Sequence, residues 1–362
     1  MLVCLFKYNM LIIINIIYYY LASHFFHRIA TAFFFAILAT SLPVAAEPFL
    51  PKADSQILEK LPVNNTNTRR EISQVKTSLA QNPSDLRLAL ISARSFIEVG
   101  RRESDPRYAG YAQAALAPWW NRADAPIEVR IMRATLAQST HRFDAALIEL
   151  DEILRIDKSN AQAWLTRASI LQGQGRYVEA LRSCQQLTGI ALSLVAKVCS
   201  TGVTNISGRA QQSYAELLRG YTQFGKGRSQ LRGWVLTQLA EMAARLGMVK
   251  SAETHFRAAL QGDADDSYLL AAYADFLLDQ KRYIEVIKTM QNKTRADGLL
   301  LRYAEALKLS NDIQAADQII MLQQRFKAVA LRGDLSHQRE QARFALHLDN
   351  NPRLALQLAQ EN

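Results

Sequence analysis

Short sequence motifs recur in this chain at an interval of 34 residues. The phrase RFDAAL begins at Arg142 and RYVEAL at Arg176, while RATLA begins at Arg133 and RASIL at Arg167. A fixed period of roughly 20 to 50 residues is typical of repeat proteins, in which each unit buries its apolar face only by stacking on its neighbours. The interval therefore predicts an array of short, equivalent units.

Within one unit, residues 127–160, apolar side chains recur at helical spacing in two blocks, and STHR at 139–142 separates them. This pattern predicts a helix, a tight turn and a second helix. The same design recurs in 161–194, 233–266 and 267–300, and again from Asp297. Small side chains let two helices approach closely, and alanine recurs at the expected crossing: Ala134, Ala168, Ala240, Ala274 and Ala304.

Composition points the same way. The 15 glycines and 9 prolines in 362 residues are too few for an all-β protein with many tight turns. After residue 70 the common residues are Ala, Leu, Gln, Arg and Glu, which are good helix formers. The sequence therefore predicts an all-α fold.

These repeats resemble the tetratricopeptide family, and the resemblance covers residues 71–362. It implies a right-handed superhelix, or α-solenoid, of about six to seven helix-turn-helix units. The 72 residues from Tyr177 to Val249 exceed two periods by four, so the middle unit is expected to carry an insertion. The last predicted helix, with Ala355 and Ala359, has no following neighbour, which favours a C-terminally truncated chain over an end that meets a partner.

The first 46 residues contain no Asp or Glu, and they read as a signal peptide. An apolar segment of residues 29–42 is followed by Pro43 and VAA, which predicts cleavage after Ala46 and a periplasmic or secreted protein without a stable membrane span. The segment MLVCLFKYNMLIIINIIYYY upstream is interpreted as a mis-assigned start, and anchoring by an uncleaved N-terminal segment is the alternative. Residues 47–70 hold three prolines and predict a flexible leader.

Charge and cysteine content narrow the expected partners. Cleavage would remove Lys7 and Arg28, which lowers the net charge from +10 to +8. The basic residues mostly alternate with acidic ones, which favours solvated helix faces over a nucleic-acid-binding stripe. Cys184 and Cys199 are 15 residues apart, and an exported location allows a disulfide between consecutive helices; two buried thiols are the alternative.

No catalytic motif stands out. GYTQFGKG at 220–227 approximates a phosphate-binding loop, but Gly227 stands where that loop needs Ser or Thr, and a helical stretch precedes it. The histidines lack metal-ligand spacing. The sequence therefore predicts neither an enzyme nor a cofactor or metal site.

The resemblance implies that the first helix of each unit lines a concave, partner-binding groove. The second half of this groove would combine carboxylates with aromatic side chains, which suits a basic or amide-rich segment. Replacement of both Glu241 and Asp275 by lysine is predicted to abolish capture of the partner segment without loss of folding. The predicted groove residues are Glu128, Thr135, Gln138, Gln162, Ser169, Gln172, Trp234, Glu241, Arg245, Tyr268, Asp275, Glu305 and Lys308.

The function predicted from these features is that of a non-catalytic scaffold in the bacterial cell envelope, which binds an extended or helical segment of another protein. The alternative is an accessory module that binds an anionic glycan in polysaccharide export or cell-wall synthesis. Salt sensitivity separates the two, because binding of a polyanion through net charge weakens with ionic strength.

Overall fold

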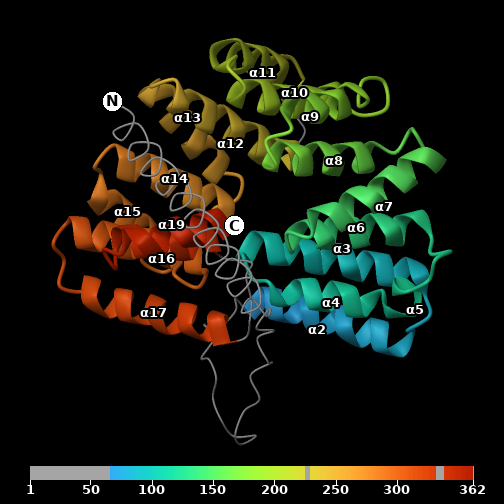
Figure 1. Cartoon of the computed structure of the whole chain (residues 1–362), viewed down its shortest axis with the longest axis horizontal. Helices are drawn as coiled ribbons and strands as arrows, with labels where there is room; N and C mark the ends of the chain where they lie inside the picture. The colour runs from blue at the N-terminus through green and yellow to red at the C-terminus, as the bar shows by residue number, and fades with distance from the viewer. Residues whose placement is uncertain (1–65, 225–228, 332–337, 362) are drawn as a thin grey trace, which may run out of the picture. The chain divides into compact units, whose positions relative to one another are not determined.

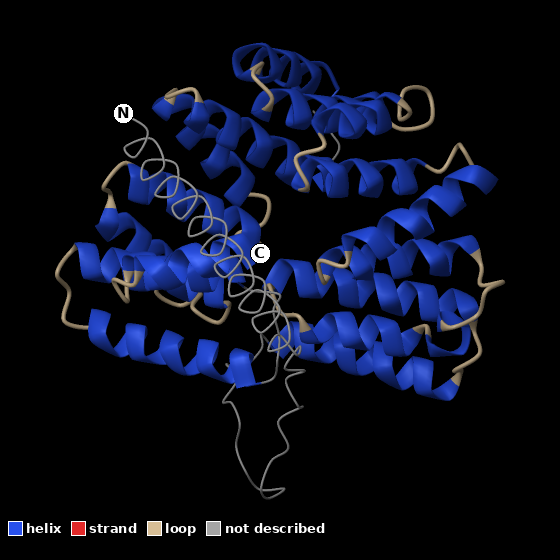
Figure 2. Ribbon diagram, viewed as in Figure 1, coloured by secondary structure: helices blue, strands red, loops and turns tan. Residues whose placement is uncertain are grey.

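The computed structural model describes residues 66–224, 229–331 and 338–361. Helices α2 to α19 make up the regular structure of these residues, which contain no strand (Figure 2). The predicted all-α superhelix of helix pairs is confirmed. Residues 1–46 and most of the 47–70 leader lie outside the described residues, although α2 already begins at Thr66.

The helices form eight consecutive helical hairpins, preceded by α2 (Thr66–Gln81), which packs on α3 (Figure 1). The short α5 (Ala117–Trp120) follows the first hairpin. The hairpins are α3 (Leu86–Glu103) with α4 (Arg107–Ala115), α6 (Ile127–Ser139) with α7 (Phe143–Ile156), α8 (Ala161–Gly173) with α9 (Tyr177–Gln185), α10 (Ser193–Ile206) with α11 (Ala210–Phe224), α12 (Ser229–Arg245) with α13 (Val249–Leu260), α14 (Ser267–Asp279) with α15 (Tyr283–Met290), α16 (Asp297–Leu309) with α17 (Ala315–Leu331), and α18 (Gln338–His347) with α19 (Pro352–Glu361).

Each hairpin turns through one residue in the left-handed backbone region. In seven of them the next N–H donates to the carbonyl five residues back, as Arg176 does to Leu171 at 2.8 Å and Arg282 to Leu277 at 2.9 Å. This closure of the helix end is the Schellman motif. The residues at this position are Ser104, His141, Gly175, Gly208, Gly247, Lys281, Asn311 and Asn350.

The helix crossings are filled by the small residues that the sequence indicated. Ala134, Ala168, Ala240, Ala274 and Ala304 are at most 2% exposed. In the second helices Ala146, Ala180 and Ala252 are fully buried. Because these side chains are small, neighbouring helices approach closely and the larger residues fill the space beside them.

The middle of the array forms a complete hairpin, α10 with α11, between α9 and α12. The stretch that exceeds two periods contains this unit: α11 begins 33 residues after α9, at Ala210, and α13 begins 39 residues after α11, at Val249. The described residues thus hold eight hairpins rather than six to seven. Helix α10 joins the two hydrophobic cores, since Cys199 and Val203 pack into the first and Leu194 and Val198 into the second.

Candidate functional site

The first helices of the hairpins form the inner face of the array. Along the described residues each first helix from α3 to α16 contacts the first helix of the next hairpin, whereas successive second helices make no contact of that extent. The predicted groove residues lie on five of these first helices, α6, α8, α12, α14 and α16. What each can bind depends on which partners it already has within the chain.

In the first half, amide side chains make hydrogen bonds along this face. Gln138 Nε2 donates to Ser169 Oγ of the next hairpin at 3.0 Å, and Gln162 Nε2 donates to Thr166 Oγ1 at 3.1 Å. A side chain at Gly202 would begin 3.6 Å from Oε1 of Gln238 and 3.9 Å from Oε1 of Gln172. Amides of α8 and α12 therefore flank a glycine of α10. Thr135 donates to the carbonyl of Ile131 in its own helix, and Glu128 is exposed; neither side chain bonds to another hairpin among the described residues.

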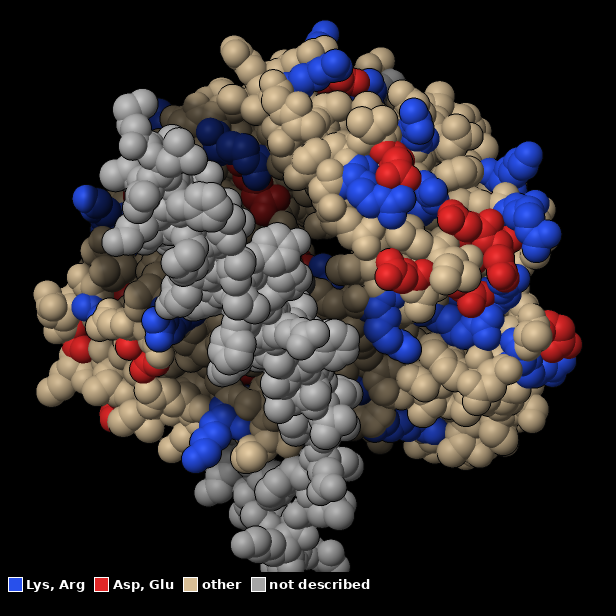
Figure 3. Space-filling model, in the orientation of Figure 1, with Lys and Arg blue, Asp and Glu red and all other residues tan. Residues whose placement is uncertain are grey.

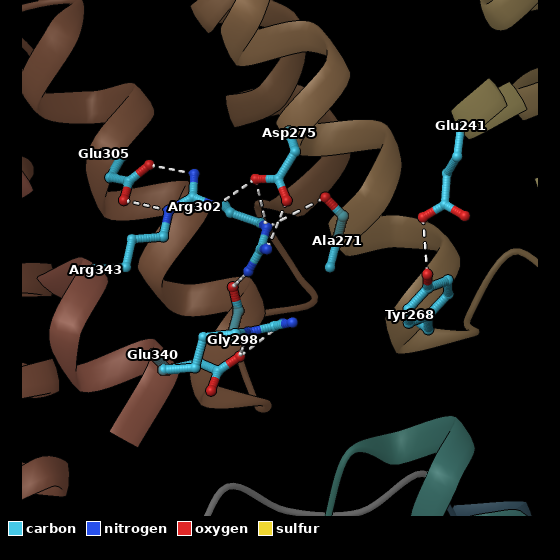
Figure 4. A network of polar contacts seen from close by, with 10 residues as sticks. Glu241, Tyr268, Ala271, Asp275, Gly298, Arg302, Glu305, Glu340 and Arg343 are labelled. Carbon is cyan, nitrogen blue, oxygen red and sulfur yellow. Dashed lines mark hydrogen bonds and ion pairs between the residues drawn. The ribbon is translucent and has the colours of Figure 1, made fainter. Parts of the chain in front are cut away.

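Two of the three carboxylates predicted for the second half are already paired with arginine (Figure 4). Arg302 makes a bidentate contact with Asp275, with Nε to Oδ1 at 2.8 Å and Nη2 to Oδ2 at 2.6 Å. Arg343 of α18 makes a bidentate contact with Glu305 at 2.7 Å and also reaches Asp275 Oδ1 at 2.6 Å. This Arg302–Asp275–Arg343–Glu305 network joins α14, α16 and α18.

Burial makes this network structural. The side chains of Arg302 and Glu305 are only 6% and 7% exposed. Burial alone would lower the pKa of Arg343, but its contacts with Glu305 and Asp275 outweigh this and raise it. A buried charge is tolerated when it is paired and hydrogen-bonded. Asp275 and Glu305 therefore hold the last hairpins together and are not free to meet a partner.

Lys308 is also occupied within the chain. Its Nζ donates to the carbonyl oxygens of His347 at 2.8 Å and Leu348 at 3.2 Å, at the end of α18. A cation at the carbonyl end of a helix interacts favourably with the helix dipole. Lys308 thus closes the C-terminal end of α18.

Glu241 differs from the other two carboxylates. Its Oε1 accepts a 2.8 Å hydrogen bond from the Tyr268 hydroxyl, and no arginine or lysine of the described residues forms an ion pair with it. Burial raises the pKa of Glu241, and the Tyr268 hydrogen bond and the nearby charge of Arg245 offset this only in part. In Figure 4, Glu241 and Tyr268 lie apart from the arginine network.

The residues predicted around Glu241 remain accessible. Tyr268 is 55% exposed and Trp234 is 37% exposed, and Arg245 is exposed one turn beyond Glu241 on α12. Protein nevertheless surrounds Tyr268 on this face, and burial together with the charge of Glu241 raises its pKa. We call Trp234, Glu241, Arg245 and Tyr268 the α12–α14 site. It offers a carboxylate that forms no ion pair with the described residues, two aromatic surfaces and one exposed guanidinium.

Sequence reasoning missed Arg302, Arg343 and Gln238. The two arginines meet carboxylates 27 to 68 residues away, and no local spacing encodes such a pairing. Gln238 carried a usable signal, because it lies one helical turn before Glu241 on the same helix face. Among the described residues no group of three or more His, Cys, Asp or Glu side chains is placed to hold a metal ion.

Cys184 and Cys199 form a disulfide, with Cα atoms 5.5 Å apart. The bond joins α9 to α10 across the turn that contains Gly189, which adopts a φ of 88°. Both cysteines are buried, so the bond belongs to the packing between the third and fourth hairpins. No helix of the described residues has the length and apolar character needed to cross a membrane.

No protein-family model matches the sequence, and no curated protein matches it. Solved structures do resemble it. The human IFIT1 dimer with m7Gppp-AAAA gives a TM-score of 0.52 at 12% identity, over 81% of this chain and 76% of that one. A tetratricopeptide repeat protein from Parabacteroides merdae gives a TM-score of 0.43 at 12% identity, over 71% of this chain and 93% of that one. The Cut9–Hcn1 structure gives 0.47 at 14% identity over 81% of this chain, which spans about half, 52%, of that one. At such identities the likeness is one of fold.

Proposed function

We propose, from the premise that the chain is an all-α tetratricopeptide-repeat superhelix, that it is a non-catalytic scaffold that captures a segment of another protein at the α12–α14 site. Stacked helical hairpins form extended concave surfaces suited to such capture. The observation that carries the proposal is Glu241: a carboxylate on the inner face whose one hydrogen bond comes from an exposed tyrosine. Its counterparts Asp275 and Glu305 are neutralised by arginine.

The chemistry of the site indicates the kind of segment that it binds. A lysine or arginine of the partner would form the ion pair that Glu241 lacks among the described residues, and Trp234 and Tyr268 would contact its aliphatic stem or an adjacent apolar side chain. The amides of α8 and α12 continue the face with hydrogen-bonding groups suited to an extended backbone. We therefore propose an extended, basic or amide-rich segment.

The raised pKa of Glu241 predicts a pH dependence for this binding. A cation at the site favours the ionised carboxylate, so binding is linked to loss of a proton from Glu241. Capture should weaken as pH falls through the raised pKa of Glu241, and the Glu241→Gln variant should lose this dependence.

We place the scaffold in the bacterial cell envelope, because an apolar segment and a small-residue cleavage pattern precede Glu47. N-terminal sequencing of the protein recovered from its own cells tests this location. A mature protein that begins at Glu47 would support export, and recovery of an uncleaved chain would contradict it.

Capture is tested with the tagged, processed chain as bait in a cross-linking pull-down from its own cell envelope, read by mass spectrometry at low and high salt. We expect a protein partner that is retained by the native chain and lost with Glu241→Lys and with Tyr268→Ala. Asp144→Lys, an exposed charge reversal on the second helix α7, is the matched control and should retain it.

Helicity and melting of each variant are measured beside the pull-down, so that a folding defect is not scored as lost binding. Retention of the partner by Glu241→Lys and Tyr268→Ala would overturn the site. Recovery only of salt-sensitive glycan would favour the alternative function, an accessory module that binds an anionic polymer.

A further inference from the structure

A cavity of about 440 Å³ lies between α7, α8 and α9, among residues that form no part of the α12–α14 site. Its volume falls within the range of about 300 to 1,000 Å³ that small-molecule sites occupy. Arginine and tryptophan dominate the lining, to which Arg155, Trp164, Arg167 and Arg182 all contribute.

Two of the arginines have no anionic partner. Arg155 lies in the last turn of α7 and Arg182 in the last turn of α9; both are exposed, and neither guanidinium forms an ion pair or hydrogen bond with the described residues. The nearby acids are already paired, as Glu152 is with Arg130 and Glu179 is with Arg176. Two arginines from neighbouring hairpins, both without an ion pair among the described residues, therefore line one cavity.

The other polar groups of the cavity are held in place. Arg167 donates from Nε to Asp151 Oδ1 at 2.7 Å and from Nη1 to Ser183 Oγ at 2.8 Å. Trp164 is half-buried and donates from Nε1 to the carbonyl oxygen of Lys158 at 2.9 Å, which fixes its ring. The Trp164 ring and the Arg167 guanidinium therefore lose little conformational entropy when a ligand binds, whereas Arg155 and Arg182 become ordered on binding.

We propose that this cavity binds a carboxylated sugar residue of an anionic glycan. Arg155 and Arg182 supply the planar forks that recognise a carboxylate. Trp164 and Leu154 supply an apolar wall for the ring, and Asp151 and Gln186 supply hydrogen-bonding groups for its hydroxyls. An acidic peptide side chain would use the arginines alone, so the tryptophan and the hydroxyl partners favour the sugar.

The test uses the processed full chain with glucuronate as the probe. Glucose, which lacks the carboxylate, and acetate, which lacks the sugar ring, are the control probes. The chain has four tryptophans, so the indole N–H signal of Trp164 is identified in an NMR spectrum by Trp164→Phe. We expect a saturable shift of this signal with glucuronate. Glucose and acetate should bind at least tenfold more weakly.

Variants locate the binding. Arg155→Ala and Arg182→Ala should each weaken glucuronate binding about tenfold, which corresponds to about 1.4 kcal/mol. Both side chains are exposed and unpaired among the described residues, so the fold should be retained, as a melting curve checks. Arg209→Ala, an exposed arginine in the turn between α10 and α11, removes the same charge and should bind glucuronate like the native chain.

Three results would overturn the proposal: equal binding of acetate and glucuronate, unchanged binding in both arginine variants, or tighter binding of a glutamate-containing peptide than of glucuronate. The Glu241→Lys variant should bind glucuronate normally, because its substitution lies in the α12–α14 site. Failure of the protein-capture proposal would therefore leave this cavity proposal standing.

Discussion

Arg295 donates from Nη2 to Asp105 Oδ2 at 2.7 Å, although 190 residues separate them. The same guanidinium pairs with Glu103, and Arg101 donates to Asp266 at 2.7 Å. These contacts accompany the packing of α3 against α14 (Figure 1), so the first hairpin meets the sixth within the superhelix. On the face drawn in Figure 3, acidic and basic side chains are interspersed.

Arg295→Ala is predicted to destabilise the fold. The side chains of Glu103 and Asp105 are only 13% and 9% exposed, so removal of the guanidinium leaves two poorly solvated carboxylates without this cation. Loss of such a charged contact costs about 1.5 to 3 kcal/mol. Urea unfolding measures the cost, and Arg122→Ala, which removes an exposed, solvent-screened pair with Asp124, should leave the stability almost unchanged. Equal costs in the two variants would contradict a structural role for Arg295.

Acid should remove stability through Glu253. Hydrogen bonds from Arg282, aided by Arg257, outweigh desolvation and lower the pKa of Glu253 from 4.5 to about 2. Because the folded pKa lies below the unfolded one, the contribution is complete above pH 4.5 and is lost as pH falls toward 2. The unfolding free energy of Glu253→Gln, measured between about pH 7 and about pH 2.5, should fall less over this window than that of the native chain. Parallel curves would show that Glu253 contributes nothing to the acid dependence.

Substitutions at Asp275 and at Glu241 should have different effects on the stability of the fold. Breaking a buried ion pair costs about 3 to 5 kcal/mol, and the 36% exposure of the Asp275 side chain reduces this, so we expect about 2 to 3 kcal/mol for Asp275→Asn. Glu241→Gln should change stability by less than about 0.5 kcal/mol, since an amide oxygen still accepts the Tyr268 hydrogen bond. Chemical denaturation of both variants checks this difference, and equal losses would contradict it.

The pairing of Asp275 also revises the expectation that lysine at both Glu241 and Asp275 leaves folding intact. An ammonium group in place of the Asp275 carboxylate would face the guanidinium groups of Arg302 and Arg343. Like charges at this half-buried position are destabilising, so the double variant would not distinguish lost folding from lost capture. The single Glu241→Lys variant avoids this ambiguity.

The disulfide should stabilise the junction of the third and fourth hairpins. Closing a loop of 15 residues is worth about 3 kcal/mol in the chain-entropy description. The Cys184→Ala, Cys199→Ala double variant should lose about this amount, and reductant should lower the thermal midpoint of the native chain but not of the variant. A midpoint that does not respond to reductant would show that the bond adds no stability.

Lys281 stands in a backbone region that suits glycine. Its φ of 59° places it at the turn position that Gly175 and Gly247 occupy in other hairpins. Lys281→Gly should therefore stabilise the fold by about 0.5 kcal/mol, because the backbone strain that it relieves exceeds the cost of the greater conformational entropy of glycine in the unfolded chain. Lys288→Gly lies within α15 and should destabilise it by about 1 kcal/mol. Urea midpoints of the two variants should move in opposite directions, and movement in the same direction would contradict the turn argument.

The sequence by itself determined the repeating unit. Helix period, the break at STHR and the recurring alanines follow from contacts within one 34-residue unit, and those contacts are local enough to leave a pattern. The pattern was weakest in the middle unit: α10 and α11 carry few of the recurring residues, so only the spacing from Tyr177 to Val249 indicated a unit there, and Gly208 marks its turn.

Only the tertiary structure decided which charges remain available. Glu241, Asp275 and Glu305 hold equivalent positions in their repeats, and from the sequence they are equal candidates. Arg343 pairs with Glu305, 38 residues away, and with Asp275, 68 residues away, so these two carboxylates are not available to a partner. In the same way, Arg295 pairs with Asp105, 190 residues away. Charged residues fill exposed helix positions by default, so their pairing is set by how the hairpins stack, and that arrangement leaves no trace in local spacing.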